Sequence, residues 1–428
     1  MKTSFKWFVM IPLLLVGCSP KNSQPTEPPK DDTAVQTEPK TPGETKDNAN
    51  IAAPEKDDAP ADNAKEADLN TETAKDVGTN DAFRPFKFTI DLDQYYEQQV
   101  CNGETGQCKS YKDLMPEPEI IIHVTDVPGA AVKYDVDCDG DGNYELEGLT
   151  GSTACKYGVK TGKFQIAIRG DIPGIMLCGD SDDEQEFDFS NHKAVLSVDQ
   201  WGDVRWKTMH RFAANCLNIQ LPEKEAPILA DVTDMSHIFQ GAINFNQSIE
   251  HWDVSHVTNL SYAFIAAFSF NKPLNRWNTS SVTDMSYAFM LCRVFNQPLD
   301  KWDVSNVKDM SGMFTEANAF NQPIANWDVS NVTVMDGMFR GASSFNQPIG
   351  SWNVSHVVDM QGMFNRATSF NQPLEQWDVA GVRTMNAMFW GATAFKQNID
   401  AWNVSRSRDT HAMFQDSGRK DLPKWYRE

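Results

Sequence analysis

The sequence predicts an α/β repeat solenoid, preceded by a small all-β sandwich and by a disordered tether. Three observations lead to this prediction. A motif recurs every 25 residues through the C-terminal half, short β-like runs alternate with turn residues in the middle, and a stretch near the N-terminus has no aromatic residue. They divide the 428 residues into five segments: 1–17, 18–82, 83–195, 196–416 and 417–428.

The N-terminus has the features of an export signal. Lys2 and Lys6 precede an apolar run that ends in the quartet Leu-Val-Gly-Cys, whose last residue is Cys18. The run is about half as long as a membrane-spanning helix, so we interpret residues 1–17 as a signal peptide. The quartet resembles the lipobox of bacterial lipoproteins, which implies that Cys18 is lipidated and that Ser19, in place of Asp, favours the outer membrane. An ordinary signal peptide with an incidental cysteine is the alternative.

The next segment has the composition of a disordered tether. Between Ser19 and Asp81 there are 15 acidic residues and 7 lysines, with many Pro, Thr and Ala residues. Such a chain cannot bury enough apolar surface to offset its conformational entropy. The net charge of −21 for the whole chain argues against direct binding to nucleic acid or to anionic lipid head groups.

The cysteines predict disulfides, because export makes them possible. Turn-rich loops separate the members of two expected pairs: Cys101 with Cys108, and Cys138 with Cys155. Three further cysteines stay without an assigned partner: Cys178, Cys216 and Cys292. At least one of these thiols is therefore expected to be free or paired outside the chain. The chain has no Cys-x-x-Cys spacing, so a zinc or thioredoxin-type site is not expected.

The 25-residue period controls the prediction for the C-terminal half. Aromatic residues recur in three series, whose members include Phe320, Trp327 and Phe339. Within this unit apolar residues between Val332 and Ala342 fall at helical spacing, which predicts a helix of about three turns with Ser330 or Asn331 as its N-cap. A short extended stretch from 324 to 329 completes the unit, and stacking of neighbours is needed to cover both apolar surfaces.

These repeats resemble a known family. The phrases Trp302-Asp-Val-Ser-Asn-Val-Lys-Asp-Met-Ser-Gly-Met-Phe314 and Phe320-Asn-Gln-Pro-Ile324 are similar to the BspA-like leucine-rich-repeat surface proteins, and to the mycoplasma-type lipoprotein repeat. The resemblance covers residues 196–416, with a degenerate first copy from Trp201 to Ile219 as the expected N-terminal cap. It implies a right-handed solenoid on the cell surface, often with a role in adhesion or host contact. The family has no catalytic residues to carry over.

Residues 83–195 predict a β-sandwich. The β-like runs are 86–90, 119–124, 132–136 and 163–168, and turn residues separate them. The end of this segment, from Cys155 to Gly170, resembles the last strands of PKD-like immunoglobulin-type modules.

An acidic turn in this segment has two interpretations. Asp137, Asp139 and Asp141, followed by Gly142, resemble the start of a calcium loop, because calcium prefers several hard oxygen ligands. The twelfth position of that loop is Gly148 in place of the bidentate Glu of an EF-hand. Asp-Gly is also a signal of a two-residue hairpin turn. We expect the segment to fold without calcium.

The sequence contains no motif that supports an enzyme. The tryptophan series could stack sugars, but one large aromatic residue per unit at a fixed position is more typical of a solenoid core. The Asp and Asn residues that follow these tryptophans exchange freely, which favours turn capping over catalysis. We expect a monomeric, lipid-anchored protein of the outer membrane or cell surface that binds an unidentified surface protein or glycan. The alternative is a structural lipoprotein that binds the bacterium's own glycans or neighbouring proteins.

Overall fold

The computed structural model describes residues 83–101, 107–114, 117–179 and 191–427, and these belong to one compact unit. The expected signal peptide, Cys18 and the expected tether lie outside the described residues. No helix among the described residues is both long and apolar enough to cross a membrane.

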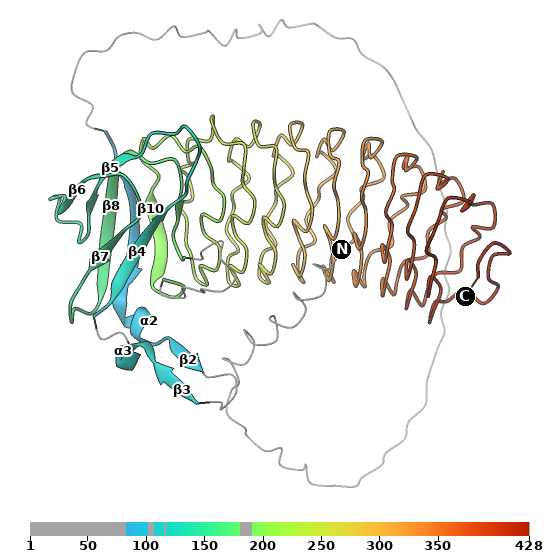
Figure 1. Cartoon of the computed structure of the whole chain (residues 1–428), viewed down its shortest axis with the longest axis horizontal. Coiled ribbons are helices and arrows are strands. Elements are labelled where there is room, and N and C mark those ends of the chain that lie inside the picture. The colour runs from blue at the N-terminus through green and yellow to red at the C-terminus, as the bar shows by residue number, and fades with distance from the viewer. Residues whose placement is uncertain (1–82, 102–106, 115–116, 180–190, 428) are drawn as a thin grey trace, which may run out of the picture. The chain divides into compact units, whose positions relative to one another are not determined.

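A five-stranded antiparallel sheet begins the described part (Figure 1). Its order is β10 (Val195–Gln200), β1 (Phe86–Asp91), β8 (Lys163–Asp171), β5 (Lys133–Asp137) and β6 (Leu146–Leu149). Burial alternates along β1, where every second side chain enters the core, as expected for a sheet with one covered face.

A second antiparallel sheet has the order β7 (Thr153–Lys156), β4 (Glu119–Val124) and β9 (Ile175–Met176). Buried isoleucines of β4 belong to the same hydrophobic cluster as the buried residues of β1. The disulfide between Cys138, which follows β5, and Cys155 in β7 links the two sheets covalently. Strands β1, β4, β5 and β8 occupy the four runs that the sequence marks as β-like, and assignment to the PKD-like class stays a prediction.

A small subdomain projects from these sheets. It consists of the hairpin β2 (Gln99–Cys101) and β3 (Cys108–Ser110) with two short helices, α2 (Leu92–Tyr96) and α3 (Tyr111–Leu114). The helix α2 begins at Asp91, whose carboxylate accepts a hydrogen bond from the backbone N–H of Asp93 at 3.0 Å. This is a side-chain N-cap.

The chain then continues as successive 25-residue coils that lie side by side (Figure 1). We call residues 201–427 the repeat stack. Isolated parallel bridges join equivalent positions of neighbouring coils from Asp234 through Asn259 and onward to Asp409. The connections therefore repeat with the period of the sequence.

The coils contain no α-helix, so the prediction of a three-turn helix with an N-cap at Ser330 or Asn331 is wrong. Backbone N–H groups of Met335, Gly337, Phe339 and Gly341 donate to carbonyls of the next coil at 2.7–3.0 Å. Between them, the N–H groups of Met338 and Arg340 donate three residues back along the chain. An α-helix would use all of these groups internally.

Left-handed residues explain why the helix is interrupted. Gly337 and Gly341 have φ of 60° and 67°, and equivalent positions in the other coils have similar values. An L-residue in this conformation costs roughly 1–2 kcal/mol, and a right-handed helix cannot contain it. Two such residues per coil turn the chain so that every second N–H group points toward the neighbouring coil.

Aromatic side chains fill the interior of the repeat stack. Phe339 stacks on Phe345 of its own coil at 3.9 Å and on Phe314 and Phe364 of the neighbouring coils at 5.8 Å between ring centroids. The seven tryptophans of the repeat series are 2–4% exposed. The predicted core role of Phe and Trp agrees with this burial.

An asparagine ladder runs along the same stack. The Oδ1 atom of Asn321 accepts a hydrogen bond from the backbone N–H of Asn346 and another from the side-chain amide of Gln347, both at 2.9 Å. The same pattern joins the coils from Asn271 to Gln397. Uniform Asn and Gln positions are therefore explained by coil-to-coil bonding.

Other segments of the chain pack on both ends of the repeat stack. Strand β10 pairs with β1 and also forms a parallel bridge from Ser197 to Gln220 in the first coil. At the other end the segment predicted as a C-terminal tail packs on the last coil, where Trp425 stacks on Trp402 at 6.5 Å. Its indole N–H donates to the carbonyl of Ile399 at 3.3 Å.

Candidate functional site

The acidic turn forms a compact carboxylate cluster after β5. Ligand atoms of Asp137, Asp139, Asp141 and Glu145 all lie within 4.8 Å of one another. Asp137 is buried, whereas the other three side chains are exposed. The three aspartates of the calcium hypothesis are therefore brought together, and Glu145 joins them.

Hydrogen bonds within the loop already use much of the oxygen surface of this cluster. The carboxylate of Asp137 accepts from the backbone N–H groups of Gly140 at 2.7 Å and Gly142 at 3.0 Å. Glu145 accepts from the backbone N–H of Cys138 at 2.8 Å. The turn is thus held by its own amides, which supports the hairpin-turn interpretation, while the remaining exposed oxygens could hold a calcium ion.

The cysteines are placed as follows. Strands β2 and β3 put Cys101 opposite Cys108 in the ladder, and Cys108 is disulfide-bonded; the side chain of Cys101 lies outside the described residues. Cys178 forms a disulfide with Cys216, which sequence analysis did not find. Cys292 is a free thiol buried in the repeat stack, where burial raises its pKa.

The Asp and Asn residues that follow the tryptophans act as turn caps. In all seven coils the side-chain Oδ1 atom accepts a hydrogen bond from the backbone N–H two residues later, as Asp328 does from Ser330 at 3.0 Å. This geometry agrees with the turn-capping interpretation. It gives these carboxylates no special pair that could work as a general acid and base.

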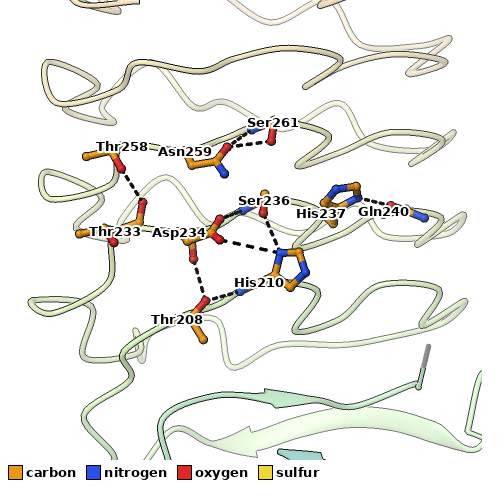
Figure 2. A network of polar contacts seen from close by, with 10 residues as sticks. All are labelled: Thr208, His210, Thr233, Asp234, Ser236, His237, Gln240, Thr258, Asn259 and Ser261. Atoms are coloured by element: carbon orange, nitrogen blue, oxygen red, sulfur yellow. Dashed lines mark hydrogen bonds and ion pairs between the residues drawn. The ribbon is translucent and has the colours of Figure 1, made fainter. Parts of the chain in front are cut away.

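A polar network crosses the first coils and combines serine, histidine and aspartate (Figure 2). The Nδ1 atom of His210 lies 2.7 Å from Ser236 Oγ and 3.9 Å from Asp234 Oδ2. A catalytic triad needs the two ring nitrogens for two different partners, whereas here one nitrogen faces both. Ser236 is also buried. The network therefore lacks the geometry of an acyl-transfer triad.

The same network shows a structural role. Asp234 accepts from the backbone N–H of Ser236 at 2.8 Å, and Asn259 accepts from Ser261 at 2.9 Å in the next coil (Figure 2). The short motif Asp/Asn-x-Ser is a turn cap in four successive coils, from Asp234 to Ser311. Sequence analysis missed this motif, although its 25-residue recurrence was visible.

One outward face of the repeat stack changes character from coil to coil. We call it the variable face and define it by four positions per coil: 236, 237, 240 and 241, and their equivalents every 25 residues. Position 236 is a buried serine in the first four of these coils, from Ser236 to Ser311. The left-handed position 237 carries these residues in successive coils: His237, Tyr262, Tyr287, Gly312, Gly337, Gly362, Ala387 and Ala412. The buried Phe239 and its equivalents stay Phe in every coil, whereas the buried position 238 changes from Ile238 and Ala263 to Met313 and the later methionines.

An aromatic row occupies the first part of the variable face. His237 stacks on Tyr262 at 4.6 Å, and Tyr262 stacks on Tyr287 at 4.8 Å. The ring of Tyr287 covers Gly312, where an added Cβ would come within 2.4 Å of the ring. The ring faces are therefore covered and the half-buried rings present their edges to solvent.

Asp336 follows the aromatic row on the variable face, beside the turn-cap carboxylates Asp309 and Asp359. Burial raises the pKa of Asp336, and the neighbouring carboxylates Asp359 and Asp309 raise it further, while a hydrogen bond from Ser311 opposes this shift. Burial also lowers the pKa of His237 to about 4. The face thus passes from neutral aromatic side chains to acidic groups within four coils.

These observations define a repeat protein whose coils are joined by backbone and amide ladders. A family model described as "Mycoplasma protein of unknown function, DUF285" matches residues 207–327 and 310–425, which together span more than half of the 428 residues. The chain belongs to this family and is a repeat protein of the mycoplasma surface type. Comparisons with curated proteins and with solved structures found no match.

Proposed function

We propose that the chain is a lipid-anchored cell-surface protein whose variable face binds a protein or glycan partner. Lipid on Cys18 would hold the chain at the membrane, and the repeat stack would display the binding surface. The variable face carries this proposal, because its residues change more than the aromatic core positions and the asparagine-ladder positions of the same coils. Uniform interior positions with changing outward positions are expected where a rigid scaffold serves recognition.

The chemistry of the partner follows from the variable face. Tyrosine hydroxyls and ring edges, next to the carboxylates of Asp309, Asp336 and Asp359, suit a ligand rich in hydrogen-bond donors and positive charge. The buried tryptophans offer no surface for sugar stacking, so a glycan would bind through its hydroxyl groups at ring edges. A long array of this kind binds through several weak contacts that act together.

A pair of substitutions tests this proposal. Changing Tyr262 and Tyr287 to Gly removes the aromatic row, while later coils show that Gly fits this left-handed position. The full chain and this variant are compared in capture of partners from host and bacterial envelope extracts. The variant is expected to lose the captured partner. The control Lys301→Gln, on a different corner of the coil, is expected to retain it. Equal capture by all three proteins would contradict the proposal.

Display at the cell surface is tested separately. Protease treatment of intact cells should remove the repeat stack if it faces outward, and Cys18→Ser should release the chain from the membrane fraction. A second candidate, an envelope-organising lipoprotein that faces the periplasm, predicts that the repeat stack survives the protease. The acidic composition of the residues outside the repeat stack is expected for both the surface-displayed and the periplasmic protein.

A further inference from the structure

The last coil leaves a row of backbone donors without acceptors. In every internal coil four alternate N–H groups donate to carbonyls of the next coil, as Met385, Ala387, Phe389 and Gly391 do at 2.8–2.9 Å. The equivalent groups of the last coil belong to Thr410, Ala412, Phe414 and Asp416. We call these four the terminal amide row. Among the described residues no oxygen accepts a hydrogen bond from any of these four backbone groups.

A cavity opens beside this row. It has a volume of about 330 Å³ and is lined by His411, Ala412, Phe414, Gln415, Leu422 and Tyr426. Two members of the terminal amide row therefore contribute to its wall, together with apolar and polar side chains. Unpaired backbone donors are costly when they are removed from water, so the row and the cavity together form a surface that favours an acceptor-bearing ligand.

The charge around this end differs from that of the whole chain. Residues 401–428 contain six basic and four acidic residues, and Arg419 is paired with Asp400, whereas the whole chain has a net charge of −21. Lys420, Lys424 and Arg427 are exposed, and none of them forms an ion pair with a residue that the structure describes. This end is therefore much less acidic than the chain as a whole, and these three cations favour an acidic ligand.

We propose that the terminal amide row is a docking edge for an extended, acidic polypeptide segment of a partner protein. The spacing of the row carries this choice of ligand, because equivalent rows in the internal coils already bind polypeptide carbonyls of alternate residues. The segment would add to the stack as one further layer, in the manner of strand addition to a sheet edge. An apolar side chain of the segment would enter the cavity beside Phe414 and Leu422.

The same edge of a second copy cannot fill this role. Two identical edges facing each other would place donor rows against donor rows. Addition to the other end of the stack is prevented by β10, which already bonds to the first coil at Gln220. The docking edge shares the last-coil positions 411, 412, 415 and 416 with the variable face, but it uses backbone amides, whereas the proposed function is tested at Tyr262 and Tyr287. Each can therefore fail without the other.

A labelled peptide of nine residues that alternates Glu and Val tests the proposal on the full chain. Fluorescence anisotropy measures its affinity, and hydrogen–deuterium exchange measures protection of individual amides. Binding should slow exchange at Ala412, Phe414 and Asp416 at least tenfold and leave Ala387 and Phe389 unchanged. A matched peptide that alternates Lys and Val should bind at least tenfold more weakly.

Two isosteric substitutions complete the experiment. Gln415→Glu places a negative charge in the cavity wall and should lower the affinity for the acidic peptide at least tenfold. Gln361→Glu places the same charge on an internal coil and should change the affinity less than twofold. The proposal is wrong if Gln415→Glu binds as the parent does, if protection appears at other amides, or if the peptide does not bind at millimolar concentration. If inorganic sulfate alone slowed amide exchange in the terminal amide row and the peptide added nothing, the row would be a small-anion site. That result would overturn the proposal.

Discussion

The indole Nε1 of Trp327 donates a hydrogen bond to the backbone carbonyl of Leu299 in the preceding coil at 3.0 Å. Equivalent bonds join the tryptophans of the neighbouring coils to the coil before them. Each tryptophan therefore fills the core and also ties two coils together.

Trp327→Ala should strongly destabilise the repeat stack. Truncation of a buried aromatic side chain costs about 3–5 kcal/mol, and the carbonyl of Leu299 also loses its donor. Chemical denaturation followed by circular dichroism measures the change. A variant that unfolds like the parent but no longer binds a glycan would instead support a sugar-stacking role.

Two glycine substitutions separate backbone strain from steric overlap. Gly337→Ala should cost roughly 1–2 kcal/mol, because φ is 60° and an added Cβ meets nothing closer than 3.6 Å. Gly312→Ala should cost roughly 1–3 kcal/mol more, because its Cβ would overlap the Tyr287 ring.

The comparison has an internal control. In a Tyr287→Gly background the extra cost at Gly312 should disappear, which a double-mutant cycle on denaturation free energies measures. Equal costs at Gly312 and Gly337 in the parent would show that the ring moves aside freely.

Stability should fall on mild acidification because of His237. Its folded pKa of about 4 lies below the ordinary value of 6.5, mainly because of burial. The unfolded chain then binds the proton more strongly, so stability is full above about pH 6.5 and decreases as the pH falls toward 4. The expected loss between pH 7 and pH 5 is about 1–2 kcal/mol.

His237→Tyr supplies the matched variant, since Tyr occupies this position in the next two coils. Its free energy of unfolding should lack that pH-dependent component. If the unfolding free energies of parent and variant changed in parallel between pH 7 and pH 5, another group would be responsible for the pH dependence.

Calcium should have little effect on folding of the described sheets. The amides of Gly140 and Gly142 already hold Asp137 in place, so the turn does not depend on an ion. Thermal melting of the full chain with calcium and with chelator measures this directly. A rise of many degrees in Tm with calcium, lost in Asp139→Asn, would favour the calcium-loop interpretation.

Deletion of one internal coil should leave a folded protein. Removing Phe320 to Ser344 takes out 25 residues and keeps every aromatic series and ladder in phase. Because each coil contacts its neighbours only, circular dichroism should show a cooperative transition close to that of the parent. Affinity for a partner of the variable face should fall in part, and complete loss in a folded deletion would indicate one local site.

The sequence predicted the period and the buried positions but not the backbone of the coil. Residues from Val332 to Ala342 recur at spacings typical of a helix, yet the same inward spacing arises from consecutive turns. A signal was present in Gly337 and Gly341, four residues apart, since glycine favours left-handed conformations. Other coils carry Tyr287 or Glu316 at these positions, which concealed the pattern.

The candidate site was predictable only where its residues are close in sequence. Asp137, Asp139 and Asp141 come together because one turn contains them. The Cys178–Cys216 bond joins the region after β9 to the first coil, and nothing in the local sequence indicates that these parts meet. The variable face likewise required knowledge of which positions point outward.

The junction at β10 has a mechanical consequence. A load applied between the N-terminal sheets and the last coils would cross the β1–β10 ladder, the bridge to Gln220 and the Cys178–Cys216 bond. The coils beyond this junction are joined by noncovalent ladders alone among the described contacts. Coils would therefore yield before the junction does, and each would release about 85 Å of slack chain. The repeat stack would lengthen under tension in steps and protect its attachment from rupture.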